Sequence, residues 1–202
     1  MSFNKSVKLF LPMVLLSAAA NASVVFTFDG DSPGTSTTFT DTVGGLSATF
    51  SSSADPGGFV VYPTMFETLT GNVLGDPGPA FMDNLALDVS FSQNLSAIEL
   101  DFATSDFITP SLFTVSAYEN SDLVGSVSST GQFLSGFTFP EGEIAFAGGP
   151  FNNVVISSAA TDFAVDNITV ATAPEPGTLA TFGIGLFLLG ISSVRRRKPA
   201  SE

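Results

Sequence analysis

The sequence predicts an all-β protein, an antiparallel β-sandwich of jelly-roll-like type. Short apolar segments are separated by Gly, Pro, Ser and Asp, and they are rich in the β-branched and aromatic residues that favour strands. No amphipathic helix pattern is found between the two ends of the 202-residue chain. The predicted domain covers residues 23–171 and contains no Cys, so its fold must rest on a packed core rather than on disulfides.

The first half of the domain has less regular strands than the second. Val24, Phe26 and Phe28 alternate onto one face, which predicts a strand, and a Gly- and Asp-rich loop follows. Turn residues separate the next segments. The predicted extended segments are 24–28, 35–42, 46–51 and 59–62, followed by a long irregular stretch over residues 63–80.

The second half predicts seven strands of more regular spacing. Ile98, Leu100 and Phe102 share one face of a typical example, and a turn at Gln93-Asn94 precedes it. This spacing is typical of sandwiches and jelly rolls. The predicted strands are 85–91, 97–103, 112–118, 122–128, 142–147, 151–157 and 163–170.

Charge divides the chain into three parts. All six Lys and Arg residues lie near the ends, at Lys5, Lys8 and residues 195–198, and there is no His. Of the nineteen acidic residues only Glu175 and Glu202 lie outside residues 23–173, so the domain holds seventeen carboxylates and no basic side chain. This charge repels nucleic acid and anionic lipid, and no nucleic-acid partner is expected. Divalent cations are the natural counterions.

Residues 1–22 predict a secretory signal peptide. Two lysines precede a short apolar stretch, and Ala20 and Ala22 are small residues at the positions that a signal peptidase reads. We therefore expect the secretion machinery and signal peptidase to act here and the mature chain to begin at Ser23. An N-terminal anchor that is not cleaved is the alternative.

Residues 172–202 carry three signals in a fixed order. A Pro-Glu-Pro tripeptide is followed by an uncharged apolar run over residues 177–194 and by the basic cluster of residues 195–198. A helix of this length spans about 27 Å, close to the roughly 30 Å of a hydrocarbon core, so the run predicts a transmembrane helix. Basic residues stay on the cytoplasmic side of a membrane, which predicts that the domain is exported.

This order resembles the PEP-CTERM sorting signal of exported bacterial proteins. The resemblance implies an exosortase, a membrane protease and transpeptidase, as the processing partner, with cleavage near the prolines. It also implies an inner-membrane-anchored precursor, a final location at the cell surface or outside the cell, and a Gram-negative bacterium that makes exopolysaccharide or biofilm matrix. A tail anchor that is never cleaved is the alternative. The residues that carry the resemblance are Pro174, Glu175, Pro176, Arg195, Arg196, Arg197 and Lys198.

The domain also resembles the jelly-roll body that is common in PEP-CTERM proteins, itself similar to carbohydrate-binding modules. Residues 26–29, 95–102 and 163–170 carry this second resemblance. A shared fold of this kind implies little about activity.

Asp166 is the strongest candidate for a metal ligand. It has the parity of Ile168 and Val170 in the last predicted strand, so its carboxylate should point inward, where a charge is costly without a partner. The first strand ends near Asp29, and first and last strands of a jelly roll are often neighbours. An oxygen cage for a structural Ca²⁺ is one interpretation, and an Asp bonded to a turn backbone is the other. The predicted calcium ligands are Asp29, Asp31, Asp166 and Asn167.

Catalysis is not expected. A glycosidase needs two carboxylates at a defined separation, and the domain has no His, Lys or Arg to tune them. Glu99 and Asp101 should lie on a solvated face, and Glu141 and Glu143 should flank a turn.

The sequence therefore predicts a non-enzymatic surface or matrix protein associated with exopolysaccharide. The alternative is a carbohydrate-binding module, which could use Tyr62, Tyr118 or carboxylates that act through calcium. Many sugar sites stack the ring on Trp or Tyr, and these two tyrosines are the only such residues in the chain. A secreted polysaccharide hydrolase is the third reading.

Overall fold

The computed structural model describes residues 23–76 and 85–173. They form eleven antiparallel strands and no helix, which confirms the all-β prediction. Within these residues no helix is long and apolar enough to cross a membrane. The predicted signal peptide and the predicted helix over residues 177–194 lie outside the described part of the chain. The strands are β1 (Ser23–Phe26), β2 (Phe39–Val43), β3 (Leu46–Ser51), β4 (Val60–Pro63), β5 (Asn72–Gly75), β6 (Leu87–Thr104), β7 (Leu112–Glu119), β8 (Asp122–Thr130), β9 (Gln132–Phe133), β10 (Pro140–Ser158) and β11 (Phe163–Thr172).

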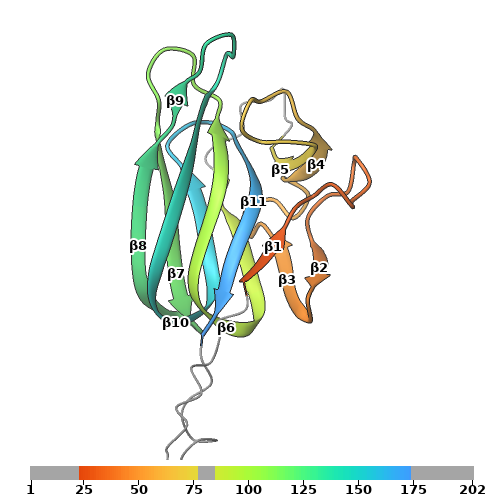
Figure 1. The fold of residues 1–202 in the computed structure, drawn as a ribbon, viewed down its shortest axis with the longest axis vertical. Helices are drawn as coiled ribbons and strands as arrows, with labels where there is room; N and C mark the ends of the chain where they lie inside the picture. Colours follow the sequence, from red (N-terminus) through yellow and green to blue (C-terminus); the bar gives the residue numbers. More distant parts are fainter. Residues whose placement is uncertain (1–22, 77–84, 174–202) are drawn as a thin grey trace, which may run out of the picture.

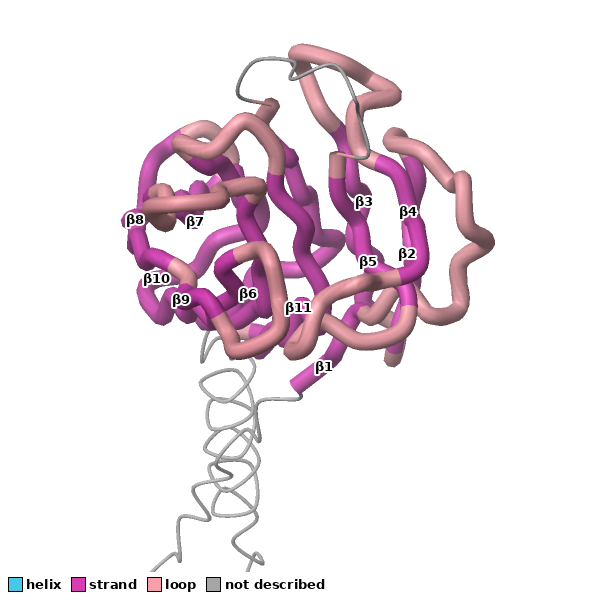
Figure 2. Tube along the Cα trace, turned by 90° about the horizontal axis from the view of Figure 1, so that it is seen from above, coloured by secondary structure: helices cyan, strands magenta, loops and turns pink. Residues whose placement is uncertain are grey.

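Two long strands, β6 and β10, belong to both layers of the sandwich (Figure 1). They pair with each other over most of their length, with register shifts between Ala147 and Asn153. The second half of β6 pairs with β11, and its first half pairs with β3. Likewise the second half of β10 pairs with β7, which pairs with β8. Seen from above, the strands enclose one interior (Figure 2).

The predicted strand pairs 85–91 with 97–103 and 142–147 with 151–157 are two continuous strands rather than four. No turn forms at Gln93-Asn94, and β6 passes through this position while it changes partner from β3 to β11. A bent strand with an irregular register keeps more backbone groups paired than a break would. The alternating pattern could not distinguish a bend from a turn.

Strand β5 was missed, because the stretch 63–80 reads as irregular in sequence. Its central residues Val73 and Leu74 are buried, and the strand connects β4 to β11. Asn, Gly and Asp surround these two apolar residues, so the local sequence resembles a loop. The pairing that makes it a strand comes from β11, about ninety residues later along the chain.

Phenylalanine fills the interior, as the absence of a polar group on this side chain predicts. The rings of Phe102 on β6 and Phe113 on β7 stack face to face. Their centroids are 4.1 Å apart, and the angle between the ring planes is 6°. Strand β1 pairs with β11, so the first and last strands are neighbours as predicted. The largest fully buried aromatic side chains are Phe26, Phe28, Phe50, Phe59, Phe102, Phe113 and Phe151.

The sandwich has two distinct ends (Figure 1). Strand β11 leads to Ala173 at the lower end, where the Ala173 N–H donates to the Asn94 carbonyl at 2.8 Å. We call this the basal end, because residues 172–198 with their sorting-signal pattern continue from it. The opposite end, which includes the connections over residues 64–71, 105–111 and 134–139, is called the distal end.

Candidate binding site

Asp166 is buried, as predicted, but it does not face the main core. Strand β11 has a register shift after Asp166, and Asn167 there has a φ of 51°. Asn tolerates this conformation better than most residues, and the extra residue of such a bulge shifts the alternation of side chains. Val165 and Ile168 therefore both contact the main core. Asp166 shares the parity of Ala164, which packs in a smaller second cluster. The predicted parity with Ile168 was wrong, although the burial was right.

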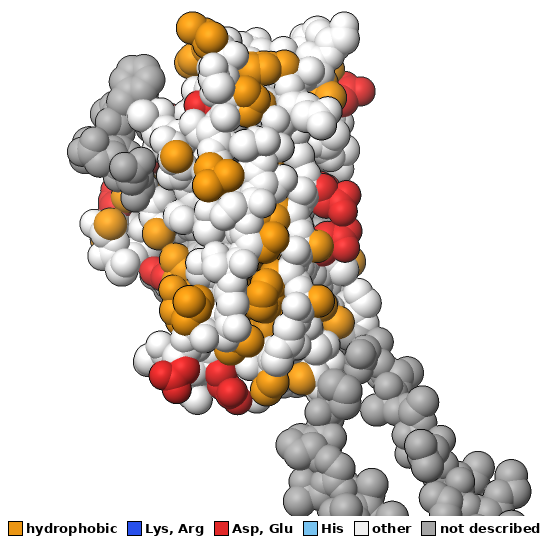
Figure 3. All heavy atoms as spheres, turned by 90° about the vertical axis from the view of Figure 1, so that its left-hand side faces the viewer, with side chains coloured by type: hydrophobic (Ala, Val, Ile, Leu, Met, Phe, Trp, Pro, Cys, Tyr) orange, Lys and Arg blue, Asp and Glu red, His pale blue; other side chains and the backbone are white. Residues whose placement is uncertain are grey.

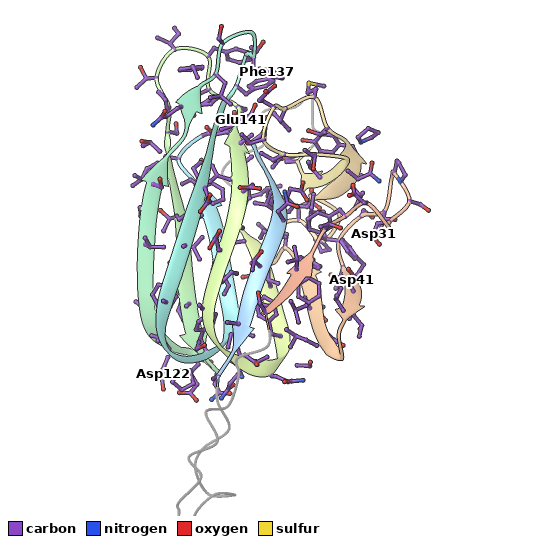
Figure 4. The ribbon with its side chains drawn as sticks, in the orientation of Figure 1. Asp31, Asp41, Asp122, Phe137 and Glu141 are labelled. Atoms are coloured by element: carbon purple, nitrogen blue, oxygen red, sulfur yellow. The ribbon has the colours of Figure 1, made fainter. Side chains whose placement is uncertain are left out.

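Carboxylates hold the connection between β4 and β5 against the sheet. We call residues 64–72 the pinned segment. Glu141, which is 3% exposed, accepts the Glu67 N–H at 2.9 Å through Oε1. Its Oε2 accepts the Thr68 N–H at 2.6 Å and the Thr68 hydroxyl at 2.7 Å. Figure 4 places Glu141 at the distal end, beside this connection. The expected turn position for Glu141 was wrong, because it lies within β10.

Asp166 and Asp29 hold the rest of the pinned segment in the same manner. Asp166 accepts the Thr70 N–H at 3.1 Å through Oδ2 and the Asn167 N–H at 2.8 Å through Oδ1. Asp29 accepts the Asn72 N–H at 2.8 Å. In a domain without basic side chains, backbone amides supply the positive ends of dipoles that buried carboxylates need. The carboxylates thus stabilise a loop that otherwise makes few ladder bonds.

Three carboxylates lie side by side on this outer face. Asp166 pairs across with Asp101 on β6, and Asp101 pairs across with Glu143 on β10. Burial is the main cause that raises the pKa of Asp166 to about 6; amide hydrogen bonds oppose it, and the charges of Asp29 and Asp101 add to it. Burial also raises the pKa of Asp101, although the Asn167 side-chain amide donates to it at 2.9 Å.

The predicted calcium ligands do not form a compact group in this structure. Within residues 23–76 and 85–173, no three His, Cys, Asp or Glu side chains lie close enough together to hold a metal ion. Burial and the charge of Asp41 raise the pKa of Asp31 (Figure 4). The contacts of Asp29 and Asp166 are those of the alternative, carboxylates bonded to loop backbone. Calcium binding stays a prediction from the sequence.

A pocket of about 400 Å³ opens at the distal end, and we call it the distal pocket. Its volume lies within the roughly 300–1,000 Å³ of typical small-molecule sites. Met65 and Phe66, from the pinned segment, form one wall together with Phe139. The polar part of the lining comes from Tyr62, Asp76, Thr104, Ser105 and Asp162. The segment that Glu141 and Asp166 hold in place therefore also contributes Met65 and Phe66 to the pocket.

The polar part of the pocket holds two carboxyl groups that interact directly. Asp162 forms a side-chain hydrogen bond with Asp76, and burial followed by the Asp76 charge raises the pKa of Asp162. The Asp162 Oδ1 atom is buried and has no hydrogen-bond partner in the described part of the chain. Burial, then the charges of Asp76 and Asp162, raise the pKa of Tyr62 to about 12, so its hydroxyl stays protonated.

Neighbouring strand ends fix these polar groups. The Asp162 N–H donates to the Ser105 hydroxyl at 3.0 Å, and the Ser105 N–H donates to the Asp162 carbonyl at 3.0 Å. The Asp76 N–H donates to the Phe163 carbonyl at 3.2 Å. A side chain at Gly75 would bring its Cβ to 2.8 Å from the Tyr62 hydroxyl. Glycine at this position leaves the room that the tyrosine occupies.

An aromatic surface surrounds the pocket. The Phe139 ring lies 6.0 Å from Phe66 and 5.4 Å from Phe107, measured between ring centroids. Met65 is 68% exposed, Phe107 66% and Ile108 90%. Figure 3 shows hydrophobic side chains at the upper end of the molecule beside a few acidic ones, with further hydrophobic side chains lower on the same face. Exposed apolar groups gathered at one end are typical of binding surfaces.

The structure brings one of the two predicted sugar contacts to this site. Tyr62 lines the pocket, whereas Tyr118 lies on β7 next to the basal connection to β8. Asp76 and Asp162 were not singled out in the sequence, where Asp76 falls in the stretch predicted to be irregular and Asp162 directly precedes a predicted strand. No local signal could have found them, because the pairing of β5 with β11 brings them together. The predicted sorting and signal-cleavage residues lie outside the described residues.

The model of the PEP-CTERM protein-sorting motif matches residues 172–198, which confirms the resemblance predicted from the sequence. This motif marks exported proteins and is the target signal of exosortases. No curated protein matches the sequence.

Several solved structures have a similar chain trace at low identity. The K2 cleaved adhesin domain of Lys-gingipain is 14% identical with a TM-score of 0.49, over 74% of this chain and 99% of that one. The K1 cleaved adhesin domain from Porphyromonas gingivalis W83 is 7% identical with a TM-score of 0.48, over 76% and 99%. A family 11 carbohydrate-binding module from Clostridium thermocellum, in complex with a mixed-linked tetrasaccharide, is 15% identical with a TM-score of 0.37, over 78% and 100%. The ligand of this chain must be inferred from its own side chains.

Proposed function

We propose that this exported chain is a non-enzymatic surface or matrix protein that binds polysaccharide through the distal pocket. An exosortase processes the precursor at Pro174–Pro176, and the β-sandwich then associates with exopolysaccharide outside the cell. The observation that carries this proposal is the combination, in one pocket of about 400 Å³, of an aromatic wall with a few convergent polar groups. Sites for small polar ligands have this composition.

The chemistry of the lining suits a sugar. Phe66 and Phe139 offer apolar faces to the C–H side of a pyranose ring, and the Tyr62 hydroxyl can donate a hydrogen bond at its rim. The carboxyl oxygens of Asp76 and Asp162 can accept hydrogen bonds from sugar hydroxyls. A phenylalanine wall replaces the tryptophan or tyrosine platform that was expected from other sugar sites.

The place of the pocket suits a protein that is sorted by its C-terminal end. The sorting motif continues from the basal end, and the pocket lies at the distal end (Figure 1). A chain attached through its C-terminal end would then point the pocket away from the attachment. This arrangement favours binding of an extended polymer in the surroundings.

Hydrolysis is not favoured by the geometry of the carboxyl pair. Asp76 and Asp162 are in hydrogen-bond contact. Retaining glycosidases hold their carboxyl groups about 5–5.5 Å apart and inverting ones about 6.5–9.5 Å, to leave room for the scissile bond or a water. The carboxyl groups of Asp76 and Asp162 are too close together to hold a scissile bond or a water between them.

Binding of oligosaccharides to the purified mature protein tests the proposal. A glycan array identifies the ligand, and calorimetry with that ligand compares Tyr62→Phe and Tyr118→Phe, two identical changes at the only two tyrosines. We expect Tyr62→Phe to weaken binding about tenfold, which corresponds to one hydrogen bond, and Tyr118→Phe to leave it unchanged. Absence of any glycan ligand, or equal loss in both variants, would contradict the proposal.

The sorting step has its own test. Mass spectrometry of the native protein from the producing cell should find a C-terminus near Pro174–Pro176. An intact chain that ends at Glu202 would contradict exosortase processing without bearing on the pocket.

A further inference from the structure

The distal pocket contains negative charge that the protein itself does not balance. Asp162 and Asp76 face each other in its lining, and the Asp162 Oδ1 atom is buried without a hydrogen-bond partner in the described residues. Residues 23–173 contain no Lys, Arg or His. Elsewhere in the molecule, Glu141 and Asp166 receive backbone N–H donors. Among the described residues nothing donates to Asp162 Oδ1, so this oxygen can accept a donor from a ligand in the pocket.

A metal ion is a poor candidate for this donor. Ca²⁺ takes six to eight oxygen ligands, whereas most of the remaining lining is apolar, with Met65, Phe66 and Phe139 on one wall. No group of three acidic side chains within metal-binding distance occurs in the described residues. A neutral sugar hydroxyl could donate one hydrogen bond but would leave the charge of the carboxyl pair unbalanced.

A primary ammonium group fits both parts of the pocket. It carries three donors and a positive charge, so it can donate to Asp162 Oδ1 and to Asp76 at once. Ammonium groups are also attracted to aromatic faces, such as those of Phe66 and Phe139, within about 6 Å of the ring centroid. Binding of uronic acids is disfavoured, because these sugars are negatively charged and the seventeen carboxylates of residues 23–173 repel them.

We propose that the distal pocket is selective for sugar units that carry a free primary ammonium group, as in a polymer of amino sugars that lack N-acetylation. The proposal rests on the polysaccharide-binding function proposed above and names the ligand class of the same pocket. Asp162 and Asp76 bind the ammonium group, while Phe66 and Phe139 pack against the sugar ring.

The test compares three oligosaccharides of equal length by calorimetry: glucosamine, N-acetylglucosamine and glucose tetramers. Measurements at physiological salt limit the non-specific attraction of a cation to an acidic protein. We expect the glucosamine tetramer to bind at least tenfold more tightly than either of the others. In Asp162→Asn this preference should disappear while weak binding of the neutral tetramers persists.

Controls separate the pocket from the general acidity of the surface. Glu143→Gln removes one exposed carboxylate from β10 and should keep the preference. If Asp162→Asn does not fold, as judged by circular dichroism, Asp76→Asn serves in its place. A preference that survives both pocket variants would overturn the proposal, because it would arise from surface charge.

The binding data distinguish selectivity for the ammonium group from sugar binding by the pocket itself. Binding of neutral tetramers that is as tight as that of glucosamine would overturn the ammonium selectivity and leave the sugar-binding pocket standing. Absence of binding by every tetramer and by the glycan array would overturn both.

Discussion

Buried carboxylates occur in two regions of this molecule, and the two regions treat them differently. At the pinned segment, Glu141, Asp166 and Asp29 all accept backbone N–H groups at 2.6–3.1 Å. In the distal pocket, Asp162 has an oxygen without a partner in the described residues and a second carboxyl group beside it. The amide-bonded carboxylates hold a loop in place, whereas Asp162 presents an unpartnered oxygen in a pocket.

The usual partner of a carboxylate, a basic side chain, is missing from residues 23–173. Buried charges are costly unless they are paired or hydrogen-bonded, and here the backbone is the only donor in quantity. A loop that offers consecutive N–H groups, such as residues 67–72, can satisfy several carboxylates. The residues around Asp162 offer Ser105, whose hydroxyl accepts the Asp162 backbone N–H instead.

The largest effect is expected for Glu141→Ala. This change removes the acceptor of the Glu67 and Thr68 N–H groups and of the Thr68 hydroxyl. Hydrogen bonds to a charged group contribute about 1.5–3 kcal/mol, so we expect the free energy of unfolding to fall by about 2–4 kcal/mol. Glu143→Ala, two residues along the same strand and exposed, should change it by no more than about 0.5 kcal/mol. Urea unfolding measures the free energy of unfolding of both variants. An equal loss in Glu141→Ala and Glu143→Ala would contradict a special role of Glu141.

A fall in pH from 7 to 5 should stabilise the domain by about 1 kcal/mol. Burial raises the pKa of Asp166 to about 6, against about 3.9 for an exposed Asp. A raised carboxyl pKa contributes stability that is complete below about pH 4 and is lost as the pH rises through about 6. The pKa values of Asp31, Asp101 and Asp162 shift in the same direction. Urea unfolding at pH 5, 6 and 7 tests this, and highest stability at pH 7 would contradict it.

Asp162→Asn should have the opposite sign to Glu141→Ala. Replacing this carboxylate removes its repulsion from Asp76 and the desolvation cost of its charge. Since Asp162 is partly exposed, solvent screening limits the gain in the free energy of unfolding to about 0.5–1 kcal/mol. Thermal melting compares it with Glu143→Gln. A loss of stability in Asp162→Asn would mean that this carboxyl group stabilises the fold, as Glu141 does at the pinned segment.

The smallest effect is expected from a chelator. Because Asp29 and Asp166 already accept N–H groups, removal of divalent cations should change the Tm by less than about 1 °C, equivalent to less than about 0.5 kcal/mol. A larger fall that Ca²⁺ restores would support the calcium site proposed from the sequence, and it would give these carboxylates a second role.

The fold class could be predicted from the sequence, because the alternation of apolar residues and the composition of the segments are local properties. The strands Leu46–Ser51 and Leu112–Glu119 follow directly from alternating apolar residues and turn signals. The bulge at Asn167 could not be foreseen, since nothing in the local pattern distinguishes it from regular strand. It reversed the face of Asp166, and the burial of that residue then depended on a segment almost a hundred positions earlier.

The candidate site was less predictable than the fold for a related reason. Tyr62 was singled out because tyrosine is rare here, but Asp76 and Asp162 are two of many acids beside strands. Only the pairing of β4, β5 and β11 brings these three residues to one pocket. The sorting motif could be predicted because its signal is a linear order of residues that needs no tertiary contact.

A crystal structure of the mature protein with its tightest-binding oligosaccharide tests the central claim most directly. We expect a sugar ring packed against Phe66 and Phe139, with a ligand nitrogen or hydroxyl within about 3 Å of Asp162 Oδ1. A ligand seated on the carboxylate row of Asp166, Asp101 and Glu143, or beside Tyr118, with the distal pocket filled by solvent, would contradict it.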